Sequence, residues 1–312
     1  MKVTALAGGV GGARLAAGLE AALPDESLSI VVNTADDFEL WGLRICPDLD
    51  TVMYTLAGTV NSGTGWGVSG DTFHSLRMLG DYGEDTWFWL GDRDLATHIL
   101  RSSRLRSGET LTGITRGLCS RLGVRSEVLP MCDEPVATML DTPEGELEFQ
   151  EYFVRRGQRD EVRNVRFRGI EAARLTRVVR QRLRESDAIV FCPSNPVVSL
   201  GPILAVPGLR EALVEAGAPK VAVSPIIGGK ALKGPADKML ASTGRASSAS
   251  GVSRIYSGLV DAMVIDHADK DEAAEIEALG MRAFVTDAVM SDEPDRARLA
   301  REVLRISEEL SS

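Results

Sequence analysis

The chain has 312 residues, of which 44% are hydrophobic and 26% charged, which is ordinary for a folded protein and excludes a largely disordered chain. Its net charge of −10 argues against an electrostatic nucleic-acid binder, and its four cysteines without a CxxC motif give neither a disulfide framework nor a zinc site. The absence of a long apolar run and of a signal-peptide core predicts a cytoplasmic protein without membrane partners.

The first elements along the chain are a strand, a glycine-rich loop, a helix and a second strand. Residues 3–7 are apolar and precede GGVGG, and then Leu15, Leu19 and Leu23 recur on one helix face. Residues 28–33 form a second strand of the buried type. This unit predicts an α/β protein with a Rossmann-like, doubly wound and mostly parallel sheet.

Strands and helices also alternate in the C-terminal part of the chain, whereas the middle part has predicted helices and a β-insertion. Strands are predicted at 188–192, 221–224, 262–266 and 282–286, and helices at 92–101, 111–122, 207–216, 270–279 and 295–309. A β-insertion is predicted over 126–149. We therefore expect a core of residues 1–60 and 185–312, interrupted by a helical and β insertion of residues 61–184.

Residues 155–184 contain eleven arginines and three acidic residues. Such a run predicts a solvated helix face with a basic loop, or alternatively a contact for an anionic ligand or a partner subunit.

Four glycines separate the first strand from the first helix: Gly8, Gly9, Gly11 and Gly12. They allow backbone N–H groups to approach a phosphate at a helix N-terminus, although a tight structural turn is the alternative. The spacing is not that of a dinucleotide-binding loop, because Arg14 occupies the position of the third glycine and Asn33 replaces the ribose-binding acid. The loop predicts phosphate binding without identifying the nucleotide.

Two later loops follow predicted strands and are expected to meet the glycine loop. Ser194 and Asn195 follow one strand, and Ser224 and Lys230 follow the next, with Lys233 close behind. Because the carboxyl ends of parallel strands share one edge, we expect Ser194, Asn195, Ser224 and Lys230 to bind the nucleotide with the four glycines.

Carboxylates cluster after the second strand: Asp36, Asp37, Asp48 and Asp50. Such a group without histidine or cysteine suits a hard cation such as magnesium, held together with phosphate oxygens. The alternative for Asp50 is a helix N-cap. Asparagine also caps helices, so we expect Asp50→Asn to fold normally.

Arg93 lies in the segment Gly91 to Asp94 at the start of a predicted helix. Its guanidinium could neutralise a diphosphate or hold a planar ligand, or form an ion pair with Asp92 or Asp94. The sequence has no GxSxG or HExxH motif and no Cys–His nucleophile pair, which argues against covalent and zinc catalysis.

The order of these motifs resembles the 2-phospho-L-lactate transferase family (CofD, called FbiA in mycobacteria) of coenzyme F-420 biosynthesis. The matching segments are GGVGGARL (8–15), NTADD (33–37), ICPDLDTVMYTLAG (45–58), GWG (65–67), GDRDLATH (91–98), LPMCDEPV (129–136), PSNPVVSLGPIL (193–204) and SPIIGGKALKGPADKM (224–239).

The resemblance implies a transferase that requires Mg²⁺. It would move 2-phospholactate or phosphoenolpyruvate from a GDP-type diphosphate donor to the ribityl hydroxyl of 7,8-didemethyl-8-hydroxy-5-deazariboflavin (Fo). GMP would leave, and the product would be F-420-0 or dehydro-F-420-0. Phospholactate, phosphoenolpyruvate and phosphoglycerate differ by a few atoms, so the motifs do not choose between them.

The resemblance also assigns roles to residues. Asp50 and Arg93 match positions associated with Fo binding, and we expect both to be catalytic. Asp37 is expected to help bind Fo, and Asp36 and Asp50 to bind magnesium. The family works as a homodimer, and the insertion is expected to contribute to the deazaflavin site and to the dimer interface.

Two other functions compete with this prediction. A regulator of the YvcK-like group would bind a nucleotide sugar without catalysis, and it would share the opening glycine loop. An NAD-dependent oxidoreductase is disfavoured by Arg14 and Asn33. A melting shift with GDP, a UDP-sugar or NAD would distinguish the three.

Overall fold

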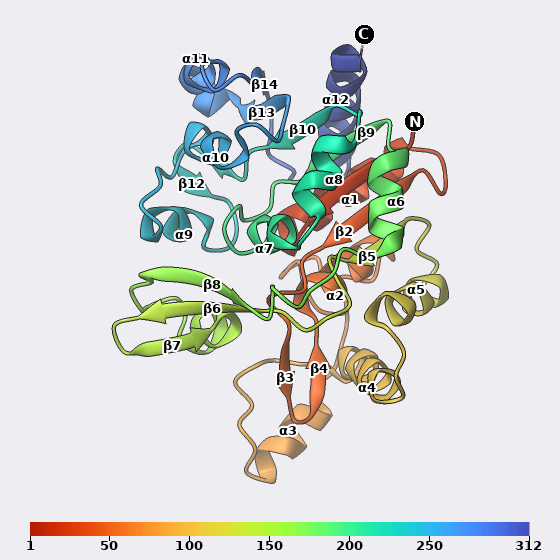
Figure 1. Cartoon of the computed structure of the whole chain (residues 1–312). Coiled ribbons are helices and arrows are strands. Elements are labelled where there is room, and N and C mark those ends of the chain that lie inside the picture. Colours follow the sequence, from red (N-terminus) through yellow and green to blue (C-terminus); the bar gives the residue numbers. More distant parts are fainter. Residues whose placement is uncertain (312) are drawn as a thin grey trace.

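A seven-stranded parallel sheet forms the centre of the protein (Figure 1). The computed structural model describes residues 1–311. The strand order is β14-β13-β10-β9-β1-β2-β5, and every neighbouring pair is parallel. The strands are β1 (Val3–Ala7), β2 (Leu28–Val32), β5 (Glu127–Pro130), β9 (Ala188–Phe191), β10 (Lys220–Val223), β13 (Ala262–Asp266) and β14 (Arg282–Thr286). The predicted Rossmann-like α/β fold is confirmed.

The sheet is buried on both faces, as its continuous apolar strands require. Along β1, Val3 and Ala5 pack into one core layer, whereas Leu6 packs into the other. The first layer contains α1 (Gly9–Ala22), α2 (Pro47–Leu56), α5 (Leu111–Arg121) and α12 (Glu293–Ser311). The second contains α6 (Arg177–Glu185), α7 (Leu200–Ala205), α8 (Leu209–Glu215), α9 (Ala236–Ser242), α10 (Ala249–Tyr256) and α11 (Ala273–Glu277).

The order of the strands reverses between β1 and β9. From β1 the chain continues to β2 and β5 on one side, whereas β9 leads to β10, β13 and β14 on the other. The helices that follow these two strands, α1 and α7, therefore lie on opposite faces of the sheet, and a crevice forms at the carboxyl ends of β1 and β9. In open parallel sheets this is where ligands bind.

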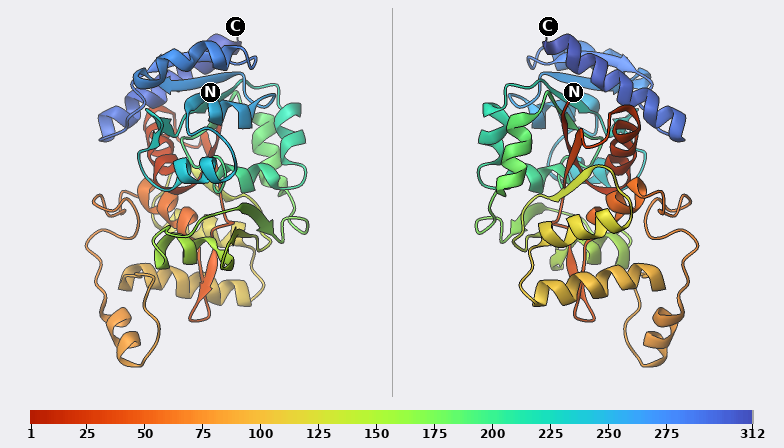
Figure 2. Two further views of the ribbon diagram at one scale, coloured as in Figure 1. Left: turned by 90° about the vertical axis from the view of Figure 1, so that its left-hand side faces the viewer. Right: turned by 90° about the vertical axis from the view of Figure 1, so that its right-hand side faces the viewer.

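Most of the remaining elements lie between β2 and β9. A hairpin of β3 (Phe38–Leu40) and β4 (Leu43–Ile45) is followed by α2, α3 (His74–Asp81), α4 (Asp92–Arg106) and α5. A second sheet, in the order β7-β6-β8, contains β6 (Ala137–Thr142), β7 (Gly145–Glu148) and β8 (Asn164–Arg168). Figure 2 shows the segment around α3 extending away from the central sheet.

Two elements differ from the sequence prediction. Strand β5 pairs with β2 in the central sheet because Val128 and Leu129 are buried, so one core strand interrupts the predicted insertion 61–184. The predicted helix 270–279 is a 3₁₀ turn (His267–Glu272) that continues into α11. Asp266 caps this turn by accepting a hydrogen bond from the N–H of Ala268, and this cap makes it begin earlier than predicted.

The arginine-rich segment 155–184 includes β8, which the sequence analysis missed, and α6. Several of its arginines form ion pairs with acidic residues of the same chain: Arg156 with Asp160, Arg166 with Asp141, Arg168 with Glu148 and Arg182 with Glu127. Acidic partners therefore neutralise part of this charge, and the role of the segment stays a prediction.

None of the helices in residues 1–311 combines the length and the apolar character that crossing a membrane demands.

Candidate active site

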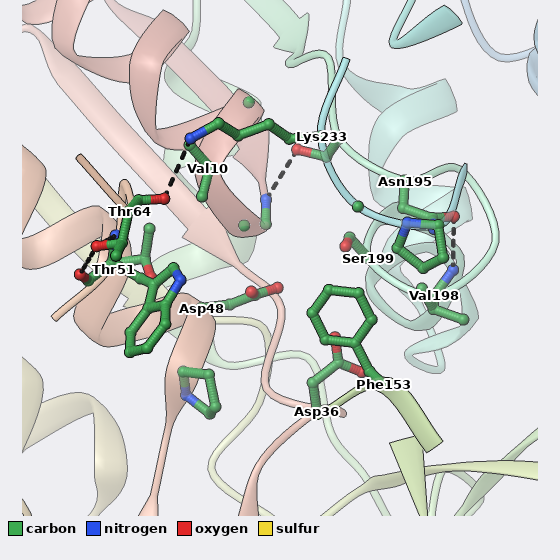
Figure 3. A pocket seen from close by; sticks show the side chains of 18 of the residues that line it. Val10, Asp36, Asp48, Thr51, Thr64, Phe153, Asn195, Val198, Ser199 and Lys233 are labelled. Atoms are coloured by element: carbon green, nitrogen blue, oxygen red, sulfur yellow. Dashed lines mark hydrogen bonds between the residues drawn. The ribbon is translucent and has the colours of Figure 1, made fainter. Parts of the chain in front are cut away.

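A cavity of about 940 Å³ lies at the crevice between the β1 and β9 loops (Figure 3). It brings together most of the residues that the sequence analysis selected: Gly8, Gly9, Gly11, Asp36, Asp50, Ser194, Asn195 and Ser224. Four other selected residues do not line it: Gly12, Asp37, Arg93 and Lys230. The convergence of the strand-end loops is therefore observed, although not every selected side chain takes part.

The glycine loop packs tightly against the loop after β9. The N–H of Gly8 donates a hydrogen bond to Ser194 Oγ over 2.9 Å. An added Cβ on Gly11 would overlap the carbonyl oxygen of Pro193, and one on Gly12 would overlap Ser194 Oγ. Gly9 has a φ of +61°, which side chains disfavour. Close backbone contact therefore requires these glycines, and it fixes the N-terminus of α1 at the cavity wall.

Replacing Gly11 by alanine is expected to raise the dissociation constant for GDP about tenfold or more, a loss of about 1.4 kcal/mol. The new methyl group must push the loop away from the carbonyl oxygen of Pro193 and displace the first turn of α1, whose residues line the cavity. Calorimetric titration measures the change. Gly217→Ala is the matched control, because a Cβ there meets open space. Unchanged GDP affinity in folded Gly11→Ala would place the nucleotide elsewhere.

Asn195 offers a free donor to the cavity. Its Oδ1 accepts hydrogen bonds from the N–H groups of Val197 and Val198 at 2.9 and 3.3 Å. Its Nδ2 is buried and has no hydrogen-bond partner within residues 1–311. A buried unpaired amide is costly, and a polar ligand atom in the cavity would satisfy it.

The acidic residues of α2 enter the cavity from the first helical turn. The helix begins at Pro47 after the N-cap Cys46, so Asp48 and Asp50 lie inside the helix near its N-terminus. The alternative interpretation of Asp50 as the N-cap is therefore wrong. Proline at the first position and two acids in the first turn both favour a helix start here.

Asp50 belongs to a buried charge network. The Nη1 of Arg101 donates to Asp50 Oδ2 over 3.0 Å, and its Nη2 donates to Oδ1. Arg101 is 1% exposed, and the neighbouring carboxylate raises its pKa. This forked pair holds the carboxylate of Asp50 in one orientation at the cavity wall.

His98 and Asp94 extend this network. Arg101 Nη1 lies 3.2 Å from His98 Nδ1. A guanidinium can only donate, so His98 Nδ1 accepts and Nε2 carries the proton. Nε2 lies 3.2 Å from Asp94 Oδ1 without a hydrogen bond to it, and Asp94 Oδ1 accepts from the hydroxyl of Tyr54 at 2.9 Å. Asp50, Tyr54, Asp94 and His98 all line the cavity. The sequence analysis did not select Tyr54, Asp94 or His98 as site residues, although two of them lie in the GDRDLATH segment.

Asp36 and Asp48 form a second acidic group at the cavity. Burial raises the pKa of Asp48 to about 6, although Asn33 Nδ2 donates to Asp48 Oδ2 over 3.0 Å. Burial and the nearby Asp48 carboxylate raise the pKa of Asp36 well above its ordinary value. Asp36 Oδ1 is buried without a hydrogen-bond partner among the described residues. Two such carboxylates can share a proton or a cation.

Asp37 points away from the cavity toward Arg44, with Asp37 Oδ2 3.4 Å from Arg44 Nη2. Burial raises the pKa of Asp37 from 3.8 to about 7, and Arg44 opposes this shift only in part. The structure thus places Asp37 behind the cavity wall.

The titration of Asp37 gives the folded protein a defined pH dependence. The folded state binds a proton that the unfolded chain has lost between about pH 4 and 7, so the free energy of unfolding falls as pH rises through this range. Asp37→Asn is expected to flatten this fall, as measured by urea unfolding at pH 5 and 8. A mutant with the wild-type pH slope would contradict the prediction.

Arg93 and Lys230 are exposed. The backbone N–H of Arg93 donates to Asp71, and its side chain reaches the carbonyl oxygen of Ser69. The predicted ion pair with Asp92 or Asp94 is not among the contacts of Arg93 in the described chain. Its predicted roles in catalysis and Fo binding stay predictions.

Aromatic side chains form another wall of the cavity: Tyr54, Trp66, Trp87, Phe88, Trp89, Phe149 and Phe153. The rings of Phe149 and Phe153 stack with centroids 5.4 Å apart. Only 5% of the chain is aromatic, so the consecutive Trp87, Phe88 and Trp89 were a signal in the sequence that the analysis did not use. Such a wall suits a flat, conjugated ligand.

Comparisons with known proteins identify the family to which the chain belongs. The family model described as 2-phospho-L-lactate transferase CofD matches residues 3–305. The chain is 44% identical to a phosphoenolpyruvate transferase of Streptomyces griseus over 99% of both chains. It is 38% identical to a 2-phospho-L-lactate transferase of Methanosarcina mazei over 96% of this chain and 98% of the relative.

A solved structure of a UPF0052 family member from Bacillus halodurans shares the fold. It has a TM-score of 0.66 at 16% identity and covers 97% of this chain and 98% of the other. The model match over nearly the whole length, together with relatives well above 30% identity, shows that the chain belongs to the CofD family of 2-phospho-L-lactate transferases.

Proposed function

We propose that this transferase moves a phosphoenolpyruvyl or 2-phospholactyl group from a GDP-linked diphosphate donor to the ribityl hydroxyl of Fo. In this reaction the hydroxyl oxygen attacks the phosphorus that carries the organic acid. The bond from that phosphorus to the oxygen bridging it to GMP breaks, and GMP leaves. The products are dehydro-F-420-0 or F-420-0. The observation that carries the proposal is one cavity with a glycine loop on one side and an aromatic wall on the other.

The donor is assigned to the side of the cavity formed by the loops after β1 and β9. There the N-terminus of α1 and the free Nδ2 of Asn195 supply N–H donors for phosphate or ribose oxygens. Ser194 and Ser224 border the same space. These groups hold a diphosphate in place without a covalent step, which is sufficient for a reaction that depends on positioning and charge neutralisation.

The acceptor is assigned to the aromatic side. A deazaflavin is a flat ring system, and the tryptophans of segment 87–89 with Phe153 offer faces and edges for it. Asp50 lies at the same cavity, with its carboxylate oriented by Arg101. We assign Asp50 to the ribityl hydroxyl, where it orients the oxygen and accepts its proton as the new bond forms.

Magnesium is assigned to Asp36 and Asp48. Asp36 has an unpaired buried oxygen and Asp48 lies beside it, so the donor set fits a hard divalent cation. Asp50 was also expected to bind magnesium. Its carboxylate already accepts two hydrogen bonds from Arg101, and the positive charge of this guanidinium disfavours a magnesium ion nearby. The bound ion would neutralise charge on the phosphate oxygens.

We assign phosphoenolpyruvate, in preference to 2-phospholactate, as the group that the enzyme transfers. The Streptomyces relatives with 44% and 43% identity carry the name phosphoenolpyruvate transferase, whereas the Methanosarcina relatives with the other name are 38% identical. The homodimer and the cytoplasmic location remain predictions.

The test is mass spectrometry of the product formed from Fo with each GDP-linked acid. We expect a new deazaflavin product and GMP in both reactions, with faster turnover of the phosphoenolpyruvyl donor. Reactions without magnesium or without Fo are the controls. If neither donor gives a new deazaflavin product, the proposal is wrong. A melting shift with a UDP-sugar and none with GDP would favour the nucleotide-sugar regulator instead.

A further inference from the structure

Two basic side chains at the cavity have no acidic partner. Arg14 and Lys233 line the cavity, and neither forms an ion pair with a carboxylate of residues 1–311. By contrast, Arg44 and Arg101, which are also shielded from solvent, each pair with a carboxylate. Arg14 also occupies the position that a third glycine would take in a dinucleotide-binding loop.

The surroundings of Arg14 leave its charge unbalanced. Its Nη1 donates to the carbonyl oxygen of Met290 over 3.0 Å, and its Nε is buried without a hydrogen-bond partner in the described chain. Burial and the nearby Arg296 lower its pKa. The guanidinium therefore has no carboxylate beside it among the described residues to balance its charge.

Lys233 adds a second charge from another part of the chain. Its Nζ donates to the carbonyl oxygen of Thr64 over 3.1 Å, a contact visible in Figure 3. Both side chains line the same cavity, and burial together with the charge of Arg14 lowers the pKa of Lys233. An anion between them would balance both charges.

Arg14 is also aligned with the glycine loop. Gly11 and Arg14 are three residues apart on α1, and Val10 and Arg14 are four apart, so they share one helix face. Gly8, Gly9, Val10 and Gly11 line the same cavity one turn earlier. The backbone N–H groups of the loop and the two cations thus face a common space.

We infer that Arg14 and Lys233 form the anion subsite that binds the diphosphate of the donor. This inference rests on the proposed function for the identity of the donor. The subsite takes a diphosphate in preference to a single phosphate, because it combines the helix N-terminus with two cations from separate segments. Arg14 and Lys233 neutralise charge on the non-bridging oxygens in this assignment.

The experiment is calorimetric titration of Arg14→Gln and Lys233→Met with GDP, inorganic pyrophosphate and guanosine at one magnesium concentration. We expect each variant to bind GDP and pyrophosphate about tenfold more weakly or worse, with unchanged affinity for guanosine. Arg121→Gln and Lys238→Met are matched controls, because both residues are exposed and lie off the cavity. They change the net charge equally and should bind all three ligands like the wild type.

Several results would overturn the inference. If both variants bind GDP and pyrophosphate with wild-type affinity, the two side chains do not form the subsite. If the variants lose affinity for guanosine as much as for GDP, the substitutions do not act on phosphate binding. Absence of pyrophosphate and GDP binding by the wild type would also overturn it. The wild type could bind pyrophosphate through Arg14 and Lys233 without binding GDP more tightly than pyrophosphate. That result would support the anion subsite and contradict the proposal that the donor carries guanosine.

Discussion

Replacing Asp50 by asparagine is expected to lower turnover of Fo by about 10²-fold or more, the scale of a lost proton-transfer or charge-stabilising group. The asparagine keeps the size of the side chain but cannot accept the proton of the ribityl hydroxyl. The measurement is the rate of product formation at saturating donor, at a temperature where circular dichroism shows the variant to be folded. GDP binding should stay near the wild-type value, because Asp50 is assigned to the acceptor.

Asp81→Asn is a suitable control, because Asp81 is an exposed acid on α3 away from the cavity. It should turn over Fo like the wild type. Near-normal turnover of folded Asp50→Asn would show that Asp50 has no part in the chemistry and only pairs with Arg101.

Replacing Arg101 by methionine is expected to lower the free energy of unfolding by about 3–5 kcal/mol. Arg101 is buried, and its removal leaves the charge of Asp50 without its counter-ion. Asp50→Asn was expected to fold normally because asparagine can cap a helix, but Asp50 is not the cap and lies in a buried ion pair with Arg101. We therefore expect this substitution to lower the free energy of unfolding by a comparable amount.

Urea unfolding of both single variants and of the double variant Asp50→Asn, Arg101→Met tests the pair. The double variant should be more stable than the sum of the two losses predicts, because it leaves no uncompensated charge. Additive losses would show that the two residues contribute separately. Exposed Arg121→Met is the control and should unfold like the wild type.

The sequence by itself determined six of the seven strands of the central sheet and the loops that meet at the cavity. Apolar runs such as 3–7 and 188–192 are strands because a parallel strand buried on both faces needs apolar residues at every position. The glycine loop and the residues after β9 are local in sequence, and sheet topology brings them to one edge. The motifs in chain order also indicated the family, and the comparisons confirm it.

Only the tertiary structure decided which charges face one another. Asp50 and Arg101 are 51 residues apart, and they meet because α2 and α4 both pack beside the cavity. Arg93 lies on the same helix as Arg101 but is exposed, with its side chain directed to the carbonyl oxygen of Ser69, whereas Asp94, the next residue, lines the cavity. Arg14 and Lys233 are also far apart in the sequence, and only folding brings both side chains to one cavity. A sequence pattern specifies which residues share a face of one element, whereas contacts between elements depend on how the elements pack.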